Sequence, residues 1–213
     1  MRVLAACEES QAVTIELRRL GHEAYSCDVL PCSGGHPEWH LQQDVRPLLQ
    51  EKWDMIIAFP PCTYLSNAGA CRLYPKKGVL DLERYRKGLE AKEFFMLFLN
   101  ADCPRVAVEN PVSSRVFDMP PFTQEIQPWQ FGHPYTKKTR LWLRGLPKLR
   151  PSFIVDPVAP WCPAGTGRKD RTKYGAATRG KDPIKRAKTF PGIAKAMAEQ
   201  WAGDIREQNN PAD

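Results

Sequence analysis

The chain has 213 residues, which suits one domain with a full hydrophobic core and is short for two. It has no apolar run of membrane-spanning length and no start typical of a signal peptide, so we expect a cytoplasmic protein without a membrane partner. Seven cysteines without CxxC pairs favour free thiols in a reducing compartment over a disulfide framework.

The positive charge is concentrated in one part of the chain. The formal net charge is +7, but residues 137–188 hold fifteen Lys and Arg against three Asp, so the remainder is acidic overall. Scattered charge usually marks a solvated surface, whereas so lopsided a block favours a nucleic acid partner. Within residues 150–186 glycines and aromatics accompany the charge, which suits a loop that closes on a phosphate backbone; disorder of the free protein is compatible with this. The expected phosphate contacts there are Arg168, Lys169, Arg171 and Lys173.

The first part of the chain predicts a strand, a helix and a second strand. Residues 2–6 are expected to form the first strand, Ser10 to cap a helix that Gly21 stops, and residues 22–27 to form a strand that ends at Asp28. This is the outline of a nucleotide-binding βαβ unit, in which the terminal acid accepts hydrogen bonds from ribose hydroxyls.

The turn between the first strand and the helix carries acids where a dinucleotide-binding loop carries glycines. Glu8 and Glu9 would repel a pyrophosphate. A cofactor with a ribose and a cationic centre but no phosphate fits better, which indicates S-adenosylmethionine.

The loop at residues 31–44 has more than one interpretation. Cys32, His36 and His40 have a C-x3-H-x3-H spacing, but no fourth ligand follows at a regular distance, so packing and capping are favoured over a metal site. Asp44 could accept a hydrogen bond from an adenine amino group or cap a short helix, and the sequence leaves both open.

Residues 54–69, DMIIAFPPCTYLSNAG, predict a buried strand that ends abruptly. The continuous apolar run at 55–59 is typical of a strand buried on both faces of a parallel sheet. Pro60 and Pro61 cannot extend a sheet ladder, so Cys62 should lie just beyond the carboxyl edge, where open α/β sheets bind their ligands. A lone cysteine is usually an ordinary half-buried thiol, but at this edge a lowered pKa would make it a nucleophile.

A second strand repeats this arrangement. Residues 106–108 are apolar and lead into Glu109, Asn110 and Pro111, so a thiol and a carboxyl group should face one cleft from two strand tips. Partial burial would raise the pKa of Glu109 and suit it to proton donation, although it could also be a plain loop carboxylate.

Helices and a further strand complete the prediction. A strand at 141–143 should bring the Arg140 guanidinium to the same edge, and a helix is expected at 191–203. Residues 82–100 predict a long amphipathic helix whose apolar side consists of Leu89, Phe94, Phe95, Leu97 and Phe98.

Four segments together carry a family resemblance. They are FPPC at 59–62, VEN at 108–110, KKTR at 137–140 and TFPGIAKAMAEQW at 189–201. Their order is similar to that of the cytosine-5 DNA methyltransferases, in particular the short forms of phage and prophage genomes, and it covers nearly the whole chain. The resemblance implies one α/β domain over residues 1–213 with a Rossmann-like S-adenosylmethionine-dependent methyltransferase fold, a mostly parallel sheet with helices on both faces, and a DNA substrate with a flipped-out cytosine.

The resemblance also implies roles for individual residues. It matches Cys62 to the cysteine that adds to cytosine C6, Glu109 to the acid that engages N3, and Arg140 to the arginine that contacts the base carbonyl, with Lys138 where a first arginine would stand. The implied cofactor contacts are Ala6, Glu8, Ser10, Asp28, Asp44, Phe59, Pro60 and Lys188.

The chain departs from the family pattern at several points. Acids replace the glycines of the first motif, Thr63 replaces a Gln, and Pro111 replaces a Val. Most of the target-recognition domain is missing, since only 45 residues separate Arg140 from Arg186. Specificity for a short context, or supplied by a partner protein, is therefore expected.

The last departure concerns the transferred group. Lys188 stands where the family has an Asn near the methionine part of the cofactor, and an ammonium beside a sulfonium costs energy. Carboxy-S-adenosylmethionine would remove that cost and make the product 5-carboxymethylcytosine. Methyl transfer is nevertheless favoured, because Lys188 could instead face phosphate or the acids Glu8 and Glu9 of the first loop.

The sequence is less typical of two other classes of protein. A non-catalytic DNA-binding member of the fold is disfavoured because thiol, carboxyl and guanidinium are all retained. An adenine amino methyltransferase is disfavoured because its motif has Asp or Asn before Pro-Pro, where this chain has Phe59.

Overall fold

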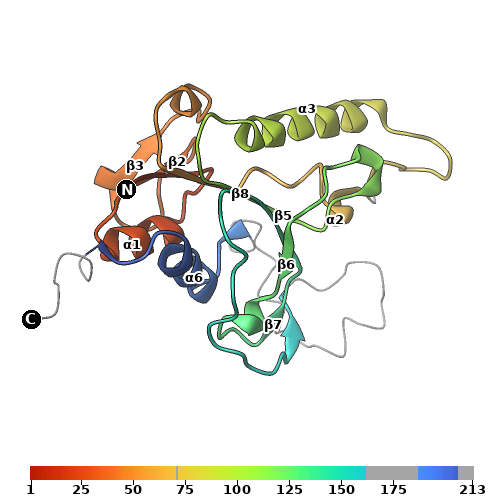
Figure 1. Cartoon of the computed structure of the whole chain (residues 1–213). Coiled ribbons are helices and arrows are strands. Elements are labelled where there is room, and N and C mark those ends of the chain that lie inside the picture. Colours follow the sequence, from red (N-terminus) through yellow and green to blue (C-terminus); the bar gives the residue numbers. More distant parts are fainter. Residues whose placement is uncertain (71, 162–186, 206–213) are drawn as a thin grey trace, which may run out of the picture.

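The computed structural model describes residues 1–70, 72–161 and 187–205 (Figure 1). Within them the strands are β1 (Arg2–Ala6), β2 (Glu23–Asp28), β3 (His40–Gln42), β4 (Met55–Ala58), β5 (Val106–Pro111), β6 (Gln124–Ile126), β7 (Tyr135–Thr136), β8 (Thr139–Arg144) and β9 (Ala159–Pro160). The helices are α1 (Ala12–Arg19), α2 (Asn67–Ala70), α3 (Leu82–Leu99) and α6 (Pro191–Trp201), with 3₁₀ turns η1 (Pro37–Trp39), η2 (Pro47–Gln50), η3 (Arg115–Phe117) and η4 (Pro128–Gln130).

Seven strands form one mostly parallel sheet in the order β3-β2-β1-β4-β5-β8-β6. The strands from β3 to β5 in this order pair in parallel, whereas β8 runs antiparallel to both β5 and β6. The carboxyl ends of β1, β2, β4 and β5 therefore meet at one edge. This confirms the predicted α/β class.

Helices cover both faces of the sheet (Figure 1). On one face α1 and α6 pack over Val3, Met55 and Ile57, and on the other α3 packs over Leu4 and Ile56. The central strands are buried on both sides because each alternate side chain enters one of these two cores. Within the described residues no helix is long and apolar enough to cross a membrane.

The strands and helices predicted from sequence are present, with ends that shift by up to three residues. Strands β1, β2, β4, β5 and β8 and helices α1, α3 and α6 lie where the patterns place them. The short strands β3, β6, β7 and β9 were not predicted, because two or three residues carry no periodicity.

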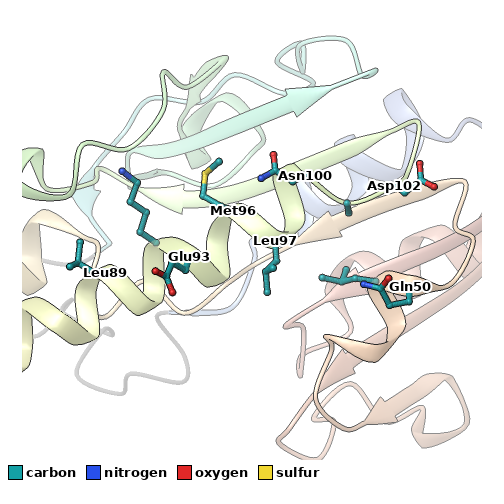
Figure 2. Close-up of a pocket in the computed structure, with 10 residues that line it drawn as sticks. Gln50, Leu89, Glu93, Met96, Leu97, Asn100 and Asp102 are labelled. Atoms are coloured by element: carbon teal, nitrogen blue, oxygen red, sulfur yellow. The ribbon is translucent and has the colours of Figure 1, made fainter.

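The predicted apolar side of α3 is wrong in part. Phe95 and Phe98 are fully buried, but Leu89 and Leu97 remain 39% and 42% exposed. These two leucines border an open groove of about 670 Å³ between α3 and the η2 turn (Figure 2). The spacing of apolar residues predicts the helix correctly, but the sheet contacts only a narrow part of its apolar face.

The predicted Ser10 cap of α1 is also wrong. Gln11 occupies the N-cap position, in the left-handed conformation and without a side-chain cap bond. Instead, Glu8 Oε1 accepts a hydrogen bond from the Val13 amide (2.7 Å), and Glu8 Oε2 accepts from the Thr14 amide (3.3 Å) and hydroxyl (2.8 Å). The buried Glu8 carboxylate thus satisfies the free amides at the start of the helix. Burial raises its pKa to about 7, against the opposing effect of these hydrogen bonds.

This environment of Glu8 predicts a pH-dependent stability. A carboxyl group whose pKa is higher in the folded than in the unfolded chain stabilises the fold when protonated, so the free energy of unfolding should fall as pH rises from about 4.5 to 7. Each unit of pKa difference corresponds to about 1.4 kcal/mol. Urea denaturation across this pH range should show the decline in the wild type and a clearly smaller one in Glu8→Gln.

The matched control is Glu16→Gln, which removes a carboxylate from the same helix, where it pairs with Arg19 at the surface. It should keep the wild-type pH dependence. Identical slopes in all three proteins would contradict the effect assigned to Glu8.

Candidate active site at the carboxyl edge of the sheet

The tips of β4 and β5 place Cys62 and Glu109 at one edge of the sheet. The two strands pair in parallel, with Ala58 opposite Val108, so both chains leave the sheet in the same direction. Cys62 follows the buried Pro60 after β4, and Glu109 lies within the last residues of β5. The structure thus brings these two residues to neighbouring strand tips, as the sequence predicts.

Hydrogen bonds fix the loop that carries Cys62. The Cys62 carbonyl accepts from the Leu65 amide (3.2 Å) and the Ser66 amide (2.9 Å), which folds the loop into a tight turn. The Ser114 amide donates to the Leu65 carbonyl (2.7 Å), and Arg84 of α3 donates to the Thr63 carbonyl (3.4 Å). The partly exposed Cys62 is therefore held between the segment after β5 and the start of α3.

The carboxyl group of Glu109 has a raised pKa. Its residue is partly exposed, but the strand tip removes most of the water around the carboxyl group, and this burial raises the pKa. The Lys137 ammonium acts in the opposite direction and lowers it. A carboxyl group in this environment holds a proton to higher pH than an exposed one, which suits an acid that donates to a bound ring.

Arg140 lies on the other face of the sheet from Glu109. In the antiparallel pair of β5 and β8, Glu109 stands opposite Leu141, whereas Arg140 stands opposite Asn110. Directly opposite residues share a face and successive residues alternate, so Glu109 and Arg140 project to opposite sides. Arg140 therefore lies at the predicted edge, opposite the tip of β5, but its side chain projects to the other face from that of Glu109.

Acidic and aromatic side chains surround the Arg140 guanidinium. Its Nε lies 3.3 Å from Glu125 Oε2, and the guanidinium carbon lies 4.3 Å from the centre of the Phe122 ring. The mostly exposed Lys138 lies 3.4 Å from the other Glu125 oxygen. Both predicted cations of this segment therefore share one carboxylate in the described structure.

Asn110 is a polar residue that the sequence analysis did not single out. It is fully buried, and among the described residues neither its Nδ2 nor its Oδ1 has a hydrogen-bond partner. A buried amide without partners costs about 1–3 kcal/mol. The sequence feature that could have drawn attention to Asn110 is its position between Glu109 and Pro111 at the end of a predicted strand.

The edge beside β1 and β2 offers groups suited to a ribose and an adenine. Asp28 ends β2, and its Oδ1 accepts from the Leu30 amide (2.9 Å). Val29 and Leu30 follow with side chains 68% and 50% exposed, which gives an apolar surface next to the carboxylate. Asp44 instead accepts from the backbone amide (2.9 Å) and the guanidinium (2.7 Å) of Arg46, which is itself the N-cap residue of η2 and has no side-chain cap bond, so Asp44 does not cap that turn.

The other predicted cofactor residues lie along the same edge, with different freedom to bind. Ala6 ends β1 and its carbonyl accepts from the Phe59 amide (2.9 Å), so that carbonyl serves the sheet. Ser10 is partly exposed in the first loop. Both Glu8 oxygens are engaged by α1, so its expected place among the cofactor contacts is replaced by a role in the helix start.

Lys188 spans two loops at this edge. Its Nζ donates to Ser33 Oγ (2.7 Å) and lies 3.7 Å from Glu9 Oε1. The Ser33 amide in turn donates to the Glu9 carbonyl (2.8 Å). Lys188 therefore faces an acid of the first loop, one of the arrangements that the sequence analysis considered.

The donor set of this edge fits S-adenosylmethionine. Carboxylates at Asp28 and Glu9 suit ribose hydroxyls and a cationic group, and the exposed Val29 and Leu30 suit an adenine face. The first loop contains Glu8 and Glu9 and no glycine, so it is unlike the glycine-rich turn that binds a pyrophosphate. The predicted DNA contacts Arg168, Lys169, Arg171 and Lys173 lie outside the described residues.

Comparison with known proteins gives structural similarities only. No family model matches the sequence, and no curated protein matches it. The structure resembles a prophage-encoded E. coli protein described as a DNA modification methyltransferase (14% identity, 74% of this chain and 52% of that chain, TM-score 0.44). It also resembles the Entamoeba histolytica methyltransferase EhMeth (12% identity, 72% and 57%, TM-score 0.43) and the S. pombe Dnmt2 methyltransferase (11% identity, 85% and 56%, TM-score 0.38).

This chain spans little more than half the length of the structures that it resembles. At TM-scores below 0.5 and identities of 11–14%, the similarities establish no shared activity. The chemistry of the site has to carry any assignment of function.

The buried amide of Asn110 generates a prediction about stability. Because it makes no hydrogen bond among the described residues, the apolar and similarly sized Asn110→Leu should keep or increase the free energy of unfolding, by up to about 1–3 kcal/mol. Urea denaturation measures this. Asn100→Leu, at the exposed C-cap of α3, is the control and should change little. A strongly destabilised Asn110→Leu would show that the amide has partners in the folded protein.

Proposed function

We propose that the protein is a DNA methyltransferase that transfers a methyl group to C5 of a flipped-out cytosine. The observation that supports this most is the pair of strand tips that present the Cys62 thiol and the Glu109 carboxyl group, whose pKa is raised, at one edge of the sheet. C5 of cytosine is a poor nucleophile until C6 carries an added group. A thiol and a proton donor at neighbouring positions are the groups that this activation needs.

The reaction begins with the thiolate of Cys62. Its Sγ forms a bond to C6, and the electron pair of the C5–C6 double bond becomes available at C5 as the ring takes up charge at N3 and the carbonyl oxygen. The turn, which is held through the Cys62 carbonyl, fixes the backbone of this residue beyond the strand tip. The addition therefore needs a base that has left the helical stack.

Glu109 assists this addition by giving its proton to N3. A protonated carboxyl group is required, and the burial that raises the Glu109 pKa favours that form. Positioned proton transfer of this kind is worth roughly 10²–10⁴ in rate. As the ring re-forms, Glu109 takes the N3 proton back.

The cofactor edge lies beside this site. When bound, S-adenosylmethionine supplies the methyl group that C5 takes, one C–C bond replacing one S–C bond, and it leaves as the neutral thioether. Asp28 would hold the ribose, Val29 and Leu30 would border the adenine, and Phe59 and Pro60 would separate this edge from Cys62. A water molecule then takes the proton from C5, and the electron pair of that C–H bond re-forms the C5–C6 double bond and expels Cys62 Sγ as the thiolate.

The arrangement of Lys188 supports methyl rather than carboxymethyl transfer. Glu9 lies 3.7 Å from its ammonium and offsets the repulsion that an unpaired lysine would exert on a sulfonium. Carboxymethyl transfer from carboxy-S-adenosylmethionine is the second candidate. It requires Lys188 to exchange Ser33 and Glu9 for the carboxylate of the cofactor.

The substrate class follows from charge. Fifteen basic residues within 137–188 suit a phosphate backbone, and Lys138 with Arg168, Lys169, Arg171 and Lys173 would contribute contacts to it. Few residues are available to read a long sequence, so a short context or a partner protein would supply specificity. A non-catalytic DNA-binding protein would need neither the thiol nor the proton donor.

The test is nucleoside mass spectrometry of DNA after incubation with either cofactor. The wild type should form 5-methylcytosine with S-adenosylmethionine, and Cys62→Ala should form none, because C5 is not activated without the thiolate. Carboxymethylcytosine as the main product when both cofactors are present would replace the first candidate with the second. Product formation by Cys62→Ala would contradict the mechanism, and Cys103→Ala, which alters a buried thiol remote from this edge, is the control for loss of a cysteine.

A further inference from the structure

The basic residues Lys137 and Arg140 lie on opposite faces of the part of the sheet formed by β5 and β8. Ala107 and Leu141 belong to the core under α1 and α6, whereas Val108 and Trp142 belong to the core under α3. Glu109 alternates with Val108, so it projects toward the α1 and α6 side. Any cation that acts with Glu109 on a bound base has to approach from that side or from the edge.

Arg140 belongs to the other side. Its guanidinium stacks on Phe122, which in turn contacts Trp142 with ring centres 6.3 Å apart. It also pairs with Glu125 at 3.3 Å. To act on a base beside Glu109, Arg140 would have to leave both of these partners and turn to the other face of the sheet.

Lys137 lies on the Glu109 side. Its Nζ lies 6.0 Å from the centre of the Phe190 ring, and Phe190 packs in the same core as Ala107 and Leu141. Its amide donates to Gln127 Oε1 (2.9 Å), which fixes the backbone just before β8. Its ammonium is also close enough to Glu109 to lower the pKa of that carboxyl group.

We infer that Lys137, in place of Arg140, is the cation that acts with Glu109 on the target cytosine, with its ammonium donating to the carbonyl oxygen next to N3. This inference rests on the proposed function and assigns one of its catalytic groups. Motif order alone matches Arg140 to that position, but the strand register puts Arg140 on the other face, and the contact with Phe190 puts Lys137 on the Glu109 side.

The chemistry of the addition explains what a cation contributes there. When Cys62 Sγ bonds to C6, electron density moves through the ring to N3 and the carbonyl oxygen. The Lys137 ammonium stabilises the charge on the oxygen while Glu109 protonates N3, so the two groups share the developing charge. Loss of a single donor to a developing oxyanion typically costs 10²–10³ in rate.

The titratable groups that face this position come from several elements. They are Glu109 on β5, Lys137 before β8, and His133 and Tyr135 beside Phe190. Burial lowers the pKa of His133, and the Lys137 ammonium lowers the pKa of Glu109. A change at Lys137 should therefore appear in the titration of Glu109.

The experiment uses tritium exchange at C5 of cytosine in DNA, which needs no cofactor. Reversible addition of Cys62 lets C5 take a solvent proton and release tritium, so the exchange rate reports the addition step alone. Lys137→Met keeps the apolar stem and should lower the exchange rate roughly 10²-fold or more, whereas Lys137→Arg should restore much of it. Arg140→Gln should lower it far less.

The pH profile separates a catalytic role from a structural one. Exchange requires protonated Glu109, so its rate falls as pH rises through the pKa of that group, and removing the nearby cation raises this pKa. Lys137→Met should therefore move the alkaline limb to higher pH. Lys195→Gln is the matched control, because that exposed ammonium lies 3.9 Å from Glu199 on α6, and it should leave the limb in place.

The outcomes are distinguishable. A wild type that exchanges no tritium and forms no methylcytosine overturns the proposed function, and this inference with it. An active wild type with near-normal exchange in Lys137→Met and strong loss in Arg140→Gln overturns the inference alone. Thermal denaturation of each variant shows whether it is folded, and the recovery in Lys137→Arg distinguishes loss of charge from loss of packing.

Discussion

The site depends on the parallel pairing of β4 with β5. Ala58 lies opposite Val108, and both strands are buried on both faces, so a shift of one residue would exchange the two cores and is strongly disfavoured. This register brings Cys62 and Glu109 to neighbouring tips. The prolines after β4 end the ladder at a fixed point, and hydrogen bonds from the segment after β5 hold the turn at Cys62. The chemistry follows from a thiol and a carboxyl group held at that edge.

The two acids of the first loop are each engaged by neighbouring groups. Glu8 is buried against the start of α1, where the helix dipole and three donors stabilise its carboxylate, and Glu9 faces Lys188. A turn with two acids is thereby compatible with a cofactor that carries a sulfonium. In a dinucleotide-binding loop, glycines allow the backbone to approach a phosphate. The first loop of this chain has Glu8 and Glu9 in place of such glycines.

The sequence predicted the α/β class, the main strands and helices, and the strand tips of Cys62 and Glu109, because continuous apolar runs followed by proline carry strong signals. It did not predict the Glu8 cap, since a buried carboxylate four residues before the helix has no local pattern. The sequence also did not predict the face on which Arg140 lies, because the antiparallel register between β5 and β8 is set by pairing across the sheet. The buried position of Asn110 depends on the same register, and the exposed Leu89 and Leu97 of α3 show that apolar spacing does not decide which residues a sheet covers.

The most direct measurement of the central claim is the capture of the covalent bond between Cys62 and the base. DNA in which 5-fluorocytosine replaces cytosine blocks the last step, because fluorine cannot leave C5 as a cation and the sulfur therefore stays on C6. Intact-mass analysis in the presence of S-adenosylmethionine should show a protein–DNA adduct that survives denaturation, and peptide mapping should place it at Cys62. An adduct at another cysteine, or methylation of ordinary DNA with no adduct on the fluorinated one, would contradict this account.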